Sequence, residues 1–431
     1  MFKGAPLAAW SRRHPVIVRK ATRTAGIILA LLFVLVAGLV VIPAASPSTG
    51  AQIADLLRSV IGVQAVAEME SVSFQIQDVI NSTRYQITGQ KPALSFSSAV
   101  STVVATLPPI KTRTPLHPAA TAPAQVATAT AEPRQPTALP PPPTATPVPL
   151  PDIVEASPHV DGGWQAFGPV VGGHSVMARG SVKPDPARPY AQAAVVRIDL
   201  SKVNLHFVLG TQEPVAAPGT RPIARTGAIP TLDQAPDSLL IAFNGGFKSI
   251  HGHYGVQLNG TNVITPQYGL ASLVIYDNGA INLGAWGIEI TDTQHIVAIR
   301  QNCPMLVDSG TINPSVTDGN RKEWGYTVKN LDTTWRSGIG VTKDGRFLIY
   351  ATGNSLTVES LGRALLMAGA YNGMQLDING FYTRFAIYQP ANGKGKYPVV
   401  AQKLLDQMTV LPTQFLQPYD RDFFYVTLLP G

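Results

Sequence analysis

Three segments of the chain place polar residues and glycines directly after a run of apolar residues, where they could do chemistry. The segments end in Asn244-Gly245-Gly246, in Asp308, and in Asp377 with Asn379 and Gly380 behind it. A buried strand that ends in such residues presents them at the edge of a sheet, where sites are commonly built. The carboxylates could act as acid, base or nucleophile, and the glycines would let a ligand approach the backbone closely.

Each of these segments, taken alone, is also typical of a simple turn. Asn-Gly-Gly and Asp-x-Asn-Gly are common turn sequences, and an aspartate before Ser-Gly commonly forms an Asx-turn. The local sequence therefore leaves both interpretations open at all three segments.

Two further features could carry chemistry. His251-x-His253 could ligate a metal from a strand, but no third ligand is evident, so we predict no metal site. Cys303, the only cysteine, has no activating partner in the sequence and is interpreted as a small buried residue. Residues 155–431 contain no Walker-type loop, dinucleotide fingerprint, zincin motif or nucleophile elbow, and we expect no cofactor.

The elements that would position these residues are mostly short strands. Ala193–Leu200 and Val203–Gly210 are strand-like, and Leu270–Gly284 and Gly338–Thr352 each read as a hairpin around an Asp-Asn-Gly or Lys-Asp-Gly turn. One helix is indicated after the N-cap Thr357 by apolar residues at helical spacing. A strand-rich domain with a few packed helices belongs to the α+β class.

The charge distribution disfavours a nucleic-acid partner. The chain carries a net charge of +7, but residues 1–50 hold six basic residues and no acid, whereas residues 151–431 hold 21 of each sign. A protein that binds nucleic acid needs a basic face on a folded module, and the largest module here is neutral.

The N-terminal region predicts a membrane anchor. Residues 1–24 form a basic arm, and residues 25–45 contain no charge and are long enough to cross a bilayer as a signal-anchor helix. The positive charges before the span place the N-terminus in the cytoplasm and the rest outside. A cleaved signal peptide is the alternative, since small residues follow the apolar run, and it would release the same extracytoplasmic region.

Residues 51–106 and 107–154 are expected to be a membrane-proximal segment and a linker. The first shows helical spacing between Ile53 and Ile61 and strand-like alternation over Ser71–Gln90. The second is rich in Pro, Thr and Ala, with 14 of the 37 prolines between residues 108 and 151, and predicts a semi-rigid spacer. Function is therefore expected in residues 155–431.

The order of the motifs over residues 185–431 resembles the phosphodiester glycosidase family. The matching segments are the strand pair Val195–Val208, the Asn244–Phe247 turn, the hairpin turn at 277–279, Gln301–Gly310, Arg336–Gly340, and Thr357–Asp377.

The resemblance implies hydrolysis of a sugar-1-phosphodiester at the anomeric carbon, which releases free sugar and a phosphate monoester. The transition state resembles an oxocarbenium ion, which Asp377, or second Asp308, would stabilise. Arg336 would neutralise the phosphate through its bidentate fork. The residues assigned to substrate binding are Asn244, Gly245, Gly246, Asn379 and Gly380.

The chain departs from the family after the last aspartate. The family typically continues with Gly-Gly-Gly-Ser, whereas this sequence has Ile378-Asn379-Gly380-Phe381. A ligand that approaches this backbone would meet two bulky side chains.

The leading hypothesis is a membrane-anchored, extracytoplasmic glycosidase that acts on glycosyl phosphodiesters in surface or exported glycans. The alternative is a non-catalytic glycan-binding protein on the same fold, which the altered segment supports. A stalked structural wall protein is a third hypothesis. The sequence does not indicate the sugar, the aglycone or the oligomeric state.

Overall fold

The computed structural model describes residues 56–89, 94–97, 106–107, 160–317, 323–325, 332–391, 393 and 395–430. The basic arm, the predicted anchor and nearly all of the predicted linker lie outside these residues. Within the described part of the chain, no helix combines the length and apolar character needed to cross a bilayer.

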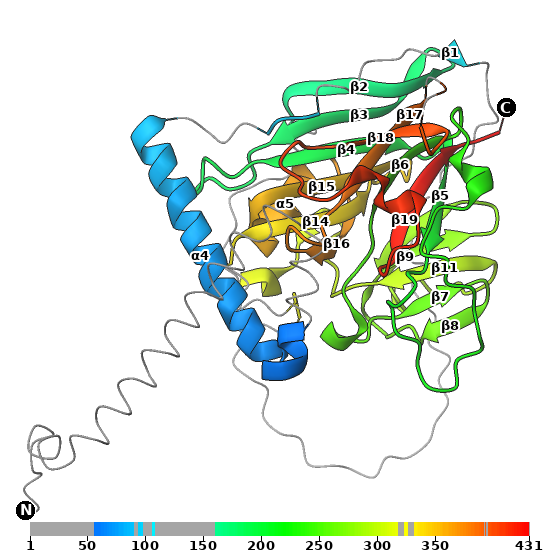
Figure 1. The fold of residues 1–431 in the computed structure, drawn as a ribbon, viewed down its shortest axis with the longest axis horizontal. Coiled ribbons are helices and arrows are strands. Elements are labelled where there is room, and N and C mark those ends of the chain that lie inside the picture. Colours follow the sequence, from blue (N-terminus) through cyan, green and yellow to red (C-terminus); the bar gives the residue numbers. More distant parts are fainter. Residues whose placement is uncertain are drawn as a thin grey trace, which may run out of the picture.

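Three sheets and two longer helices make up the described fold (Figure 1). The nine-stranded sheet runs, in spatial order, β1 (Thr106–Leu107), β2 (Asp161–Val171), β3 (His174–Val182), β4 (Ala193–Asp199), β15 (Phe347–Leu356), β14 (Thr334–Val341), β16 (Asn372–Ile378), β12 (Val307–Asp308) and β13 (Thr311–Ile312). One five-stranded sheet runs β10 (Ile281–Ala285), β9 (Ala271–Tyr276), β11 (Ile296–Gln301), β7 (Val256–Leu258) and β8 (Thr261–Ile264). The other runs β18 (Val399–Lys403), β17 (Phe385–Pro390), β6 (Leu239–Asn244), β19 (Phe423–Leu428) and β5 (Val203–Val208).

The centre of the nine-stranded sheet is buried on both faces. Along β15, Leu348 and Tyr350 face one apolar cluster, which extends into both five-stranded sheets, while Ile349 and Ala351 face a second cluster. The second cluster contains the apolar face of α5 (Val358–Met367). Side chains alternate across a strand, so a central strand between two layers must be apolar throughout.

Several predicted elements are confirmed. The predicted hairpins are β9–β10 and β14–β15, both antiparallel. Thr357 caps α5 in a reciprocal capping box with Ser360. The strand-rich character with few helices is also observed, and the described residues include four short 3₁₀ helices (Thr231–Gln234, Ser249–His251, Pro314–Thr317 and Pro412–Leu416) and helical residues 56–61.

The strand predicted over Ser71–Gln90 is wrong, because these residues lie mostly in the helix α4 (Val63–Thr88). The helix lies against the C-terminal domain (Figure 1) through polar contacts. Ser71 Oγ donates to Asp332 Oδ2 at 2.6 Å, and Asp78 accepts from the Tyr190 hydroxyl at 2.8 Å. The side chains of Val72, Ile76 and Val79 are instead exposed. Only part of the apolar residues of α4, such as the buried Val66, faces the domain, and the exposed ones misled a prediction that assumed a buried face.

Candidate active site

The ends of two strands meet at Asp377 and Asn244. β16 carries Asp377 at its penultimate position and β6 ends at Asn244. Ser337 on β14 joins them, since its hydroxyl lies 2.9 Å from Asn244 Nδ2 and donates to the backbone oxygen of Asp377 at 2.8 Å. The nine-stranded sheet and the sheet that contains β6 are therefore tied together at this point.

Asp377 is buried beside an arginine that the sequence analysis missed. One Asp377 carboxylate oxygen accepts from Arg421 Nη2, and the other accepts from the backbone N–H of Ile378 at 3.0 Å. Burial raises the pKa of Asp377 above the usual carboxyl range, while the positive charges of Arg421 and Lys248 oppose that rise. The group is thus an acid whose proton is held more tightly than in water.

Arg421 has hydrogen-bonding capacity to spare. It is 3 % exposed, and its Nη2 donates to Asp377 and to the backbone oxygen of Gly246. Its buried Nε and Nη1 find no hydrogen-bond partner among the described residues. Burial alone would lower the pKa of Arg421, but the charge of Asp377 raises it, so the guanidinium stays protonated. A buried cation with unused donors suits an anionic ligand.

Gly245 and Gly246 hydrogen-bond to the residues around the Asp377–Arg421 pair, so their N–H groups are not available to a ligand. Both N–H groups donate to Asp422, while the Gly245 oxygen accepts from the backbone N–H of Asp377. Asp422 is fixed in turn by a buried ion pair with Arg300, at 2.7 Å.

Close approach explains why glycine is needed at residue 245. A Cβ built there would lie 2.1 Å from Asp422 Oδ2. We expect Gly245→Ala to lower the free energy of unfolding by about 1–3 kcal/mol through overpacking, measured by urea denaturation. Gly362→Ala, in α5 with its nearest neighbours at 3.4 Å, is the control and should be neutral or stabilising. Equal stabilities of the two variants would contradict the assignment.

Both polar atoms of the Asn244 side chain hydrogen-bond to other residues of the protein. Its Nδ2 contacts Ser337 and the Gly245 oxygen, and its Oδ1 accepts from the backbone N–H of Arg384 at 3.0 Å and from the Tyr350 hydroxyl at 3.3 Å. The predicted contact with substrate is therefore not supported by its geometry, since these hydrogen bonds use both polar atoms of the side chain.

Arg336 lies opposite Ile378 on the neighbouring strand, but its guanidinium is used within the protein and does not contact Asp377. It is fully buried, and all three of its nitrogens donate to protein oxygens, on Leu356, Gln375 and Asp332. Burial lowers its pKa to about 10. Arg421 has the geometry that was expected of Arg336.

Asp308 is exposed at the end of β12, which pairs with β16 at Gly373. Because the pair is antiparallel, Asp308 lies opposite the residue before Gly373, five residues along β16 from Asp377, so the two aspartates are roughly 16 Å apart along the strand. The structure does not bring the two predicted carboxylates together.

Asn379 and Gly380 lie just beyond Asp377. Asn379 has φ of 75°, a left-handed conformation that glycine adopts more readily, so it reproduces the backbone course of a glycine-rich turn. A Cβ on Gly380 would lie 3.0 Å from the Trp335 ring. Ile378 is partly exposed and lines the cavity at Asp377, whereas Phe381 is buried and does not line it.

Of the other candidate groups, His251 lines the cavity at Asp377 described below, whereas Cys303 and His253 do not. Cys303 is fully buried, and burial raises the pKa of its thiol to about 12, as expected for an unreactive cysteine. His253 is exposed. Within the described residues, no group of three or more His, Cys, Asp or Glu side chains is placed to hold a metal ion.

A small cavity of about 50 Å³ opens onto Asp377. It is lined by Arg58, Ala67, Glu70, Phe74, Phe247, His251, Gly325, Asp377, Ile378, Asn379 and Tyr382. Arg58 and Glu70 form an ion pair at 2.7 Å across the helical segment that covers it. Among the charged side chains that line the cavity, Arg58 thus pairs with Glu70, and Asp377 pairs with Arg421, which is not itself a lining residue.

Comparison with known proteins confirms the resemblance seen in the sequence. Residues 237–395 match the sequence model of the phosphodiester glycosidase family. No curated protein matches the chain. Similar solved structures include the zebrafish N-acetylglucosamine-1-phosphodiester α-N-acetylglucosaminidase catalytic domain, auto-inhibited by its pro-peptide, at 14% identity over 60% of this chain and 85% of that chain, with a TM-score of 0.37. A hypothetical protein from Synechocystis is similar at 12% identity over 60% of this chain and 63% of that chain, with a TM-score of 0.32. Arg421 and Asp422 lie outside the matched segment.

Proposed function

From the family match and the Asp377–Arg421 pair, we propose that this protein hydrolyses glycosyl phosphodiesters. Water adds to the anomeric carbon, the bond from that carbon to the phosphate oxygen breaks, and the phosphate monoester leaves with the bonding electrons. Asp377 stabilises the positive charge that develops on the sugar, and Arg421 neutralises the departing phosphate. The observation that carries this proposal is a buried carboxylate touching a buried arginine whose Nε and Nη1 have no hydrogen-bond partner among the described residues.

The test is to assay the full chain against two panels of substrates. Sugar-1-phosphodiesters should release reducing sugar, whereas the corresponding methyl glycosides should not, because only the former carry the anion that Arg421 binds. Binding of the phosphodiesters without release would favour the alternative, a non-catalytic glycan-binding protein. If the protein neither binds the phosphodiesters nor releases sugar from them, both the hydrolase and the glycan-binding hypothesis are contradicted.

The location is part of the same proposal. The uncharged residues 25–45 after a basic arm support a single-pass anchor, or a cleaved signal, with the hydrolase outside the cytoplasm and glycans of the cell surface or exported glycans as substrates. Treating the full chain with protease from outside intact cells should then degrade residues 155–431, and protection would contradict this topology.

Access to Asp377 requires side chains of α4 to shift. A cavity of about 50 Å³ holds a few waters, well below the ~300 Å³ of the smallest usual ligand sites. Phe74 fills the wall that separates this cavity from a larger groove. We expect Phe74→Ala to raise kcat/KM for sugar phosphodiesters several-fold, since it merges the two spaces. Val79→Ala, an apolar truncation on the exposed face of α4, is the control, and equal effects of both changes would argue against the role of Phe74.

A further inference from the structure

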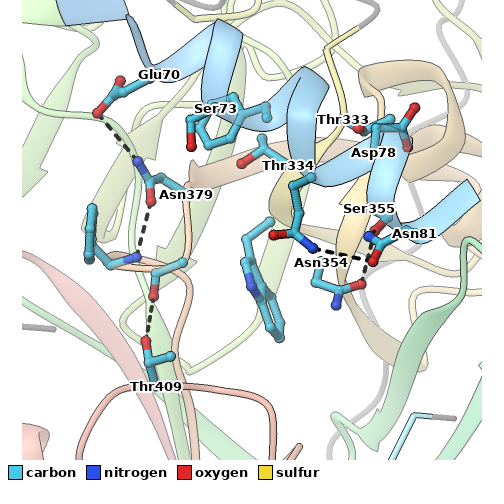
Figure 2. Close-up of a pocket in the computed structure, with 15 residues that line it drawn as sticks. Glu70, Ser73, Asp78, Asn81, Thr333, Thr334, Asn354, Ser355, Asn379 and Thr409 are labelled. Atoms are coloured by element: carbon cyan, nitrogen blue, oxygen red, sulfur yellow. Dashed lines mark hydrogen bonds between the residues drawn. The ribbon is translucent and has the colours of Figure 1, made fainter. Parts of the chain in front are cut away.

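A second, larger cavity lies between α4 and the C-terminal domain. It has a volume of about 250 Å³ and is lined by Glu70, Ser73, Phe74, Gln77, Asp78, Asn81, Thr333, Thr334, Trp335, Asn354, Ser355, Asn379, Gly380, Phe381 and Thr409. Figure 2 shows Glu70 and Asn379 at one end of this groove, and Asn81, Asn354 and Ser355 at the other.

The chemistry of this groove differs from that of the Asp377 cavity. No lysine or arginine is among the residues that line it, and its polar groups are mostly amides and hydroxyls. Its two carboxylates are already engaged, because Glu70 pairs with Arg58 at 2.7 Å and Asp78 accepts from the Tyr190 hydroxyl at 2.8 Å. A phosphate would find no cation among the lining residues, so the groove suits an uncharged ligand rich in hydroxyl groups.

Aromatic side chains give the groove the second feature that a sugar ring requires. Trp335 is partly exposed there, and Phe74 and Phe381 also line it. A pyranose presents C–H groups on its faces and hydroxyls around its rim, which match an aromatic surface surrounded by amides. Trp335 is held in place, since its backbone oxygen accepts from Asn379 N–H at 2.8 Å.

The groove continues into the Asp377 cavity. Glu70, Phe74 and Asn379 line both spaces. A ligand in the groove would therefore lie next to a sugar whose anomeric carbon is at Asp377. The α4 wall is fixed along the groove, because Asn81 Nδ2 donates to Ser355 Oγ at 3.2 Å and Asp78 is bonded to the domain.

We propose that this groove is a binding subsite for an uncharged sugar residue adjoining the scissile glycosyl phosphate, formed jointly by α4 and the strands β14 and β15. The role of this subsite in turnover rests on the proposed function. The subsite implies that the glycosyl part of the substrate is an oligosaccharide or polysaccharide rather than a monosaccharide. Trp335 and Asn354 are the residues that we expect to contact this sugar.

Calorimetric titration of the full chain with neutral disaccharides (chitobiose, maltose, cellobiose and mannobiose) tests the subsite without turnover. We expect at least one to bind with a Kd of about 1 mM or tighter, and Trp335→Ala to weaken that binding tenfold or more. Trp335→Phe should retain most of it, and Asn354→Ala provides a second variant in case Trp335→Ala fails to fold. Arg421→Gln should leave it unchanged, since the groove contains no anion site.

Three results would overturn the subsite: no disaccharide binds, binding survives both the Trp335→Ala and Asn354→Ala changes, or binding is lost in Arg421→Gln instead.

A kinetic measurement separates this proposal from the proposed function. Trp335→Ala should raise KM about tenfold for disaccharide-1-phosphodiesters and leave KM for monosaccharide-1-phosphodiesters unchanged. Absence of all turnover would contradict the proposed hydrolase activity. The calorimetry would still show whether the groove binds a sugar.

Discussion

Replacing Asp377 by Asn should reduce kcat for a sugar phosphodiester by roughly 10³-fold or more and leave the fold intact. The amide keeps the size of the side chain but removes the charge that would stabilise the oxocarbenium-like transition state. Asn can still accept from the Ile378 N–H, so the local backbone should be retained. The measurement is release of reducing sugar under saturating substrate, with circular dichroism as the check on folding.

Asp308→Asn is the matched control for this change. Asp308 is exposed and lies roughly 16 Å along the strand from Asp377, so its variant should keep wild-type turnover. Loss of activity in Asp308→Asn with activity retained in Asp377→Asn would reverse the assignment. Binding without turnover in the wild type itself would instead support the glycan-binding alternative.

The parts of the fold that follow from local sequence were predictable. The hairpins β9–β10 and β14–β15 depend on Asp-Asn-Gly and Lys-Asp-Gly turns, and α5 depends on its cap and apolar stripe. The adjacent strands β4 and β5 look like a pair in the sequence, yet they lie in different sheets, because β5 pairs with β19 and β4 with β3 and β15. Such non-local pairing leaves no local signal.

The site was only half predictable, for a geometric reason. Asp377 was identified because polar residues follow a strand, whereas Arg421 precedes one. β19 runs antiparallel to β6, with Phe423 opposite Asn244, so the start of β19 lies beside the end of β6. Applying the same rule to residues before a strand would have found the run Asp420-Arg421-Asp422.

Arg336 was chosen because its segment resembles the family and a guanidinium can bind phosphate in a bidentate way, but its surroundings already occupy all three of its nitrogens. Its position on the interior strand β14 surrounds the guanidinium with backbone and amide oxygens, which use all of its nitrogens. The contribution of α4 to both cavities was also hidden, because the helix makes many of its contacts through polar residues and exposes several of its apolar ones. Hydrophobic periodicity reports burial only where the buried face is apolar.

Arg421→Gln should change both the rate and its pH dependence. The loss of charge-assisted contacts to the leaving phosphate should lower kcat/KM by roughly 10²–10³-fold. Asp377 must be ionised to act, so activity falls as pH drops through its pKa, which burial already raises. Because Arg421 opposes that rise, its removal should move the acidic limb of the kcat/KM profile to higher pH.

Stability against pH gives an independent check on Arg421. With the arginine gone, the pKa of Asp377 in the folded protein rises further above its unfolded value, so the folded state binds the proton more tightly. The stability of Arg421→Gln relative to wild type should therefore be greatest at low pH and decline as pH rises toward the folded pKa of Asp377. Adding Asp377→Asn to Arg421→Gln should abolish that decline, since no titrating group then remains in the pair. A decline that persists in the double variant would show that another group causes it, and an unshifted acidic limb in Arg421→Gln would show that the ion pair does not tune Asp377.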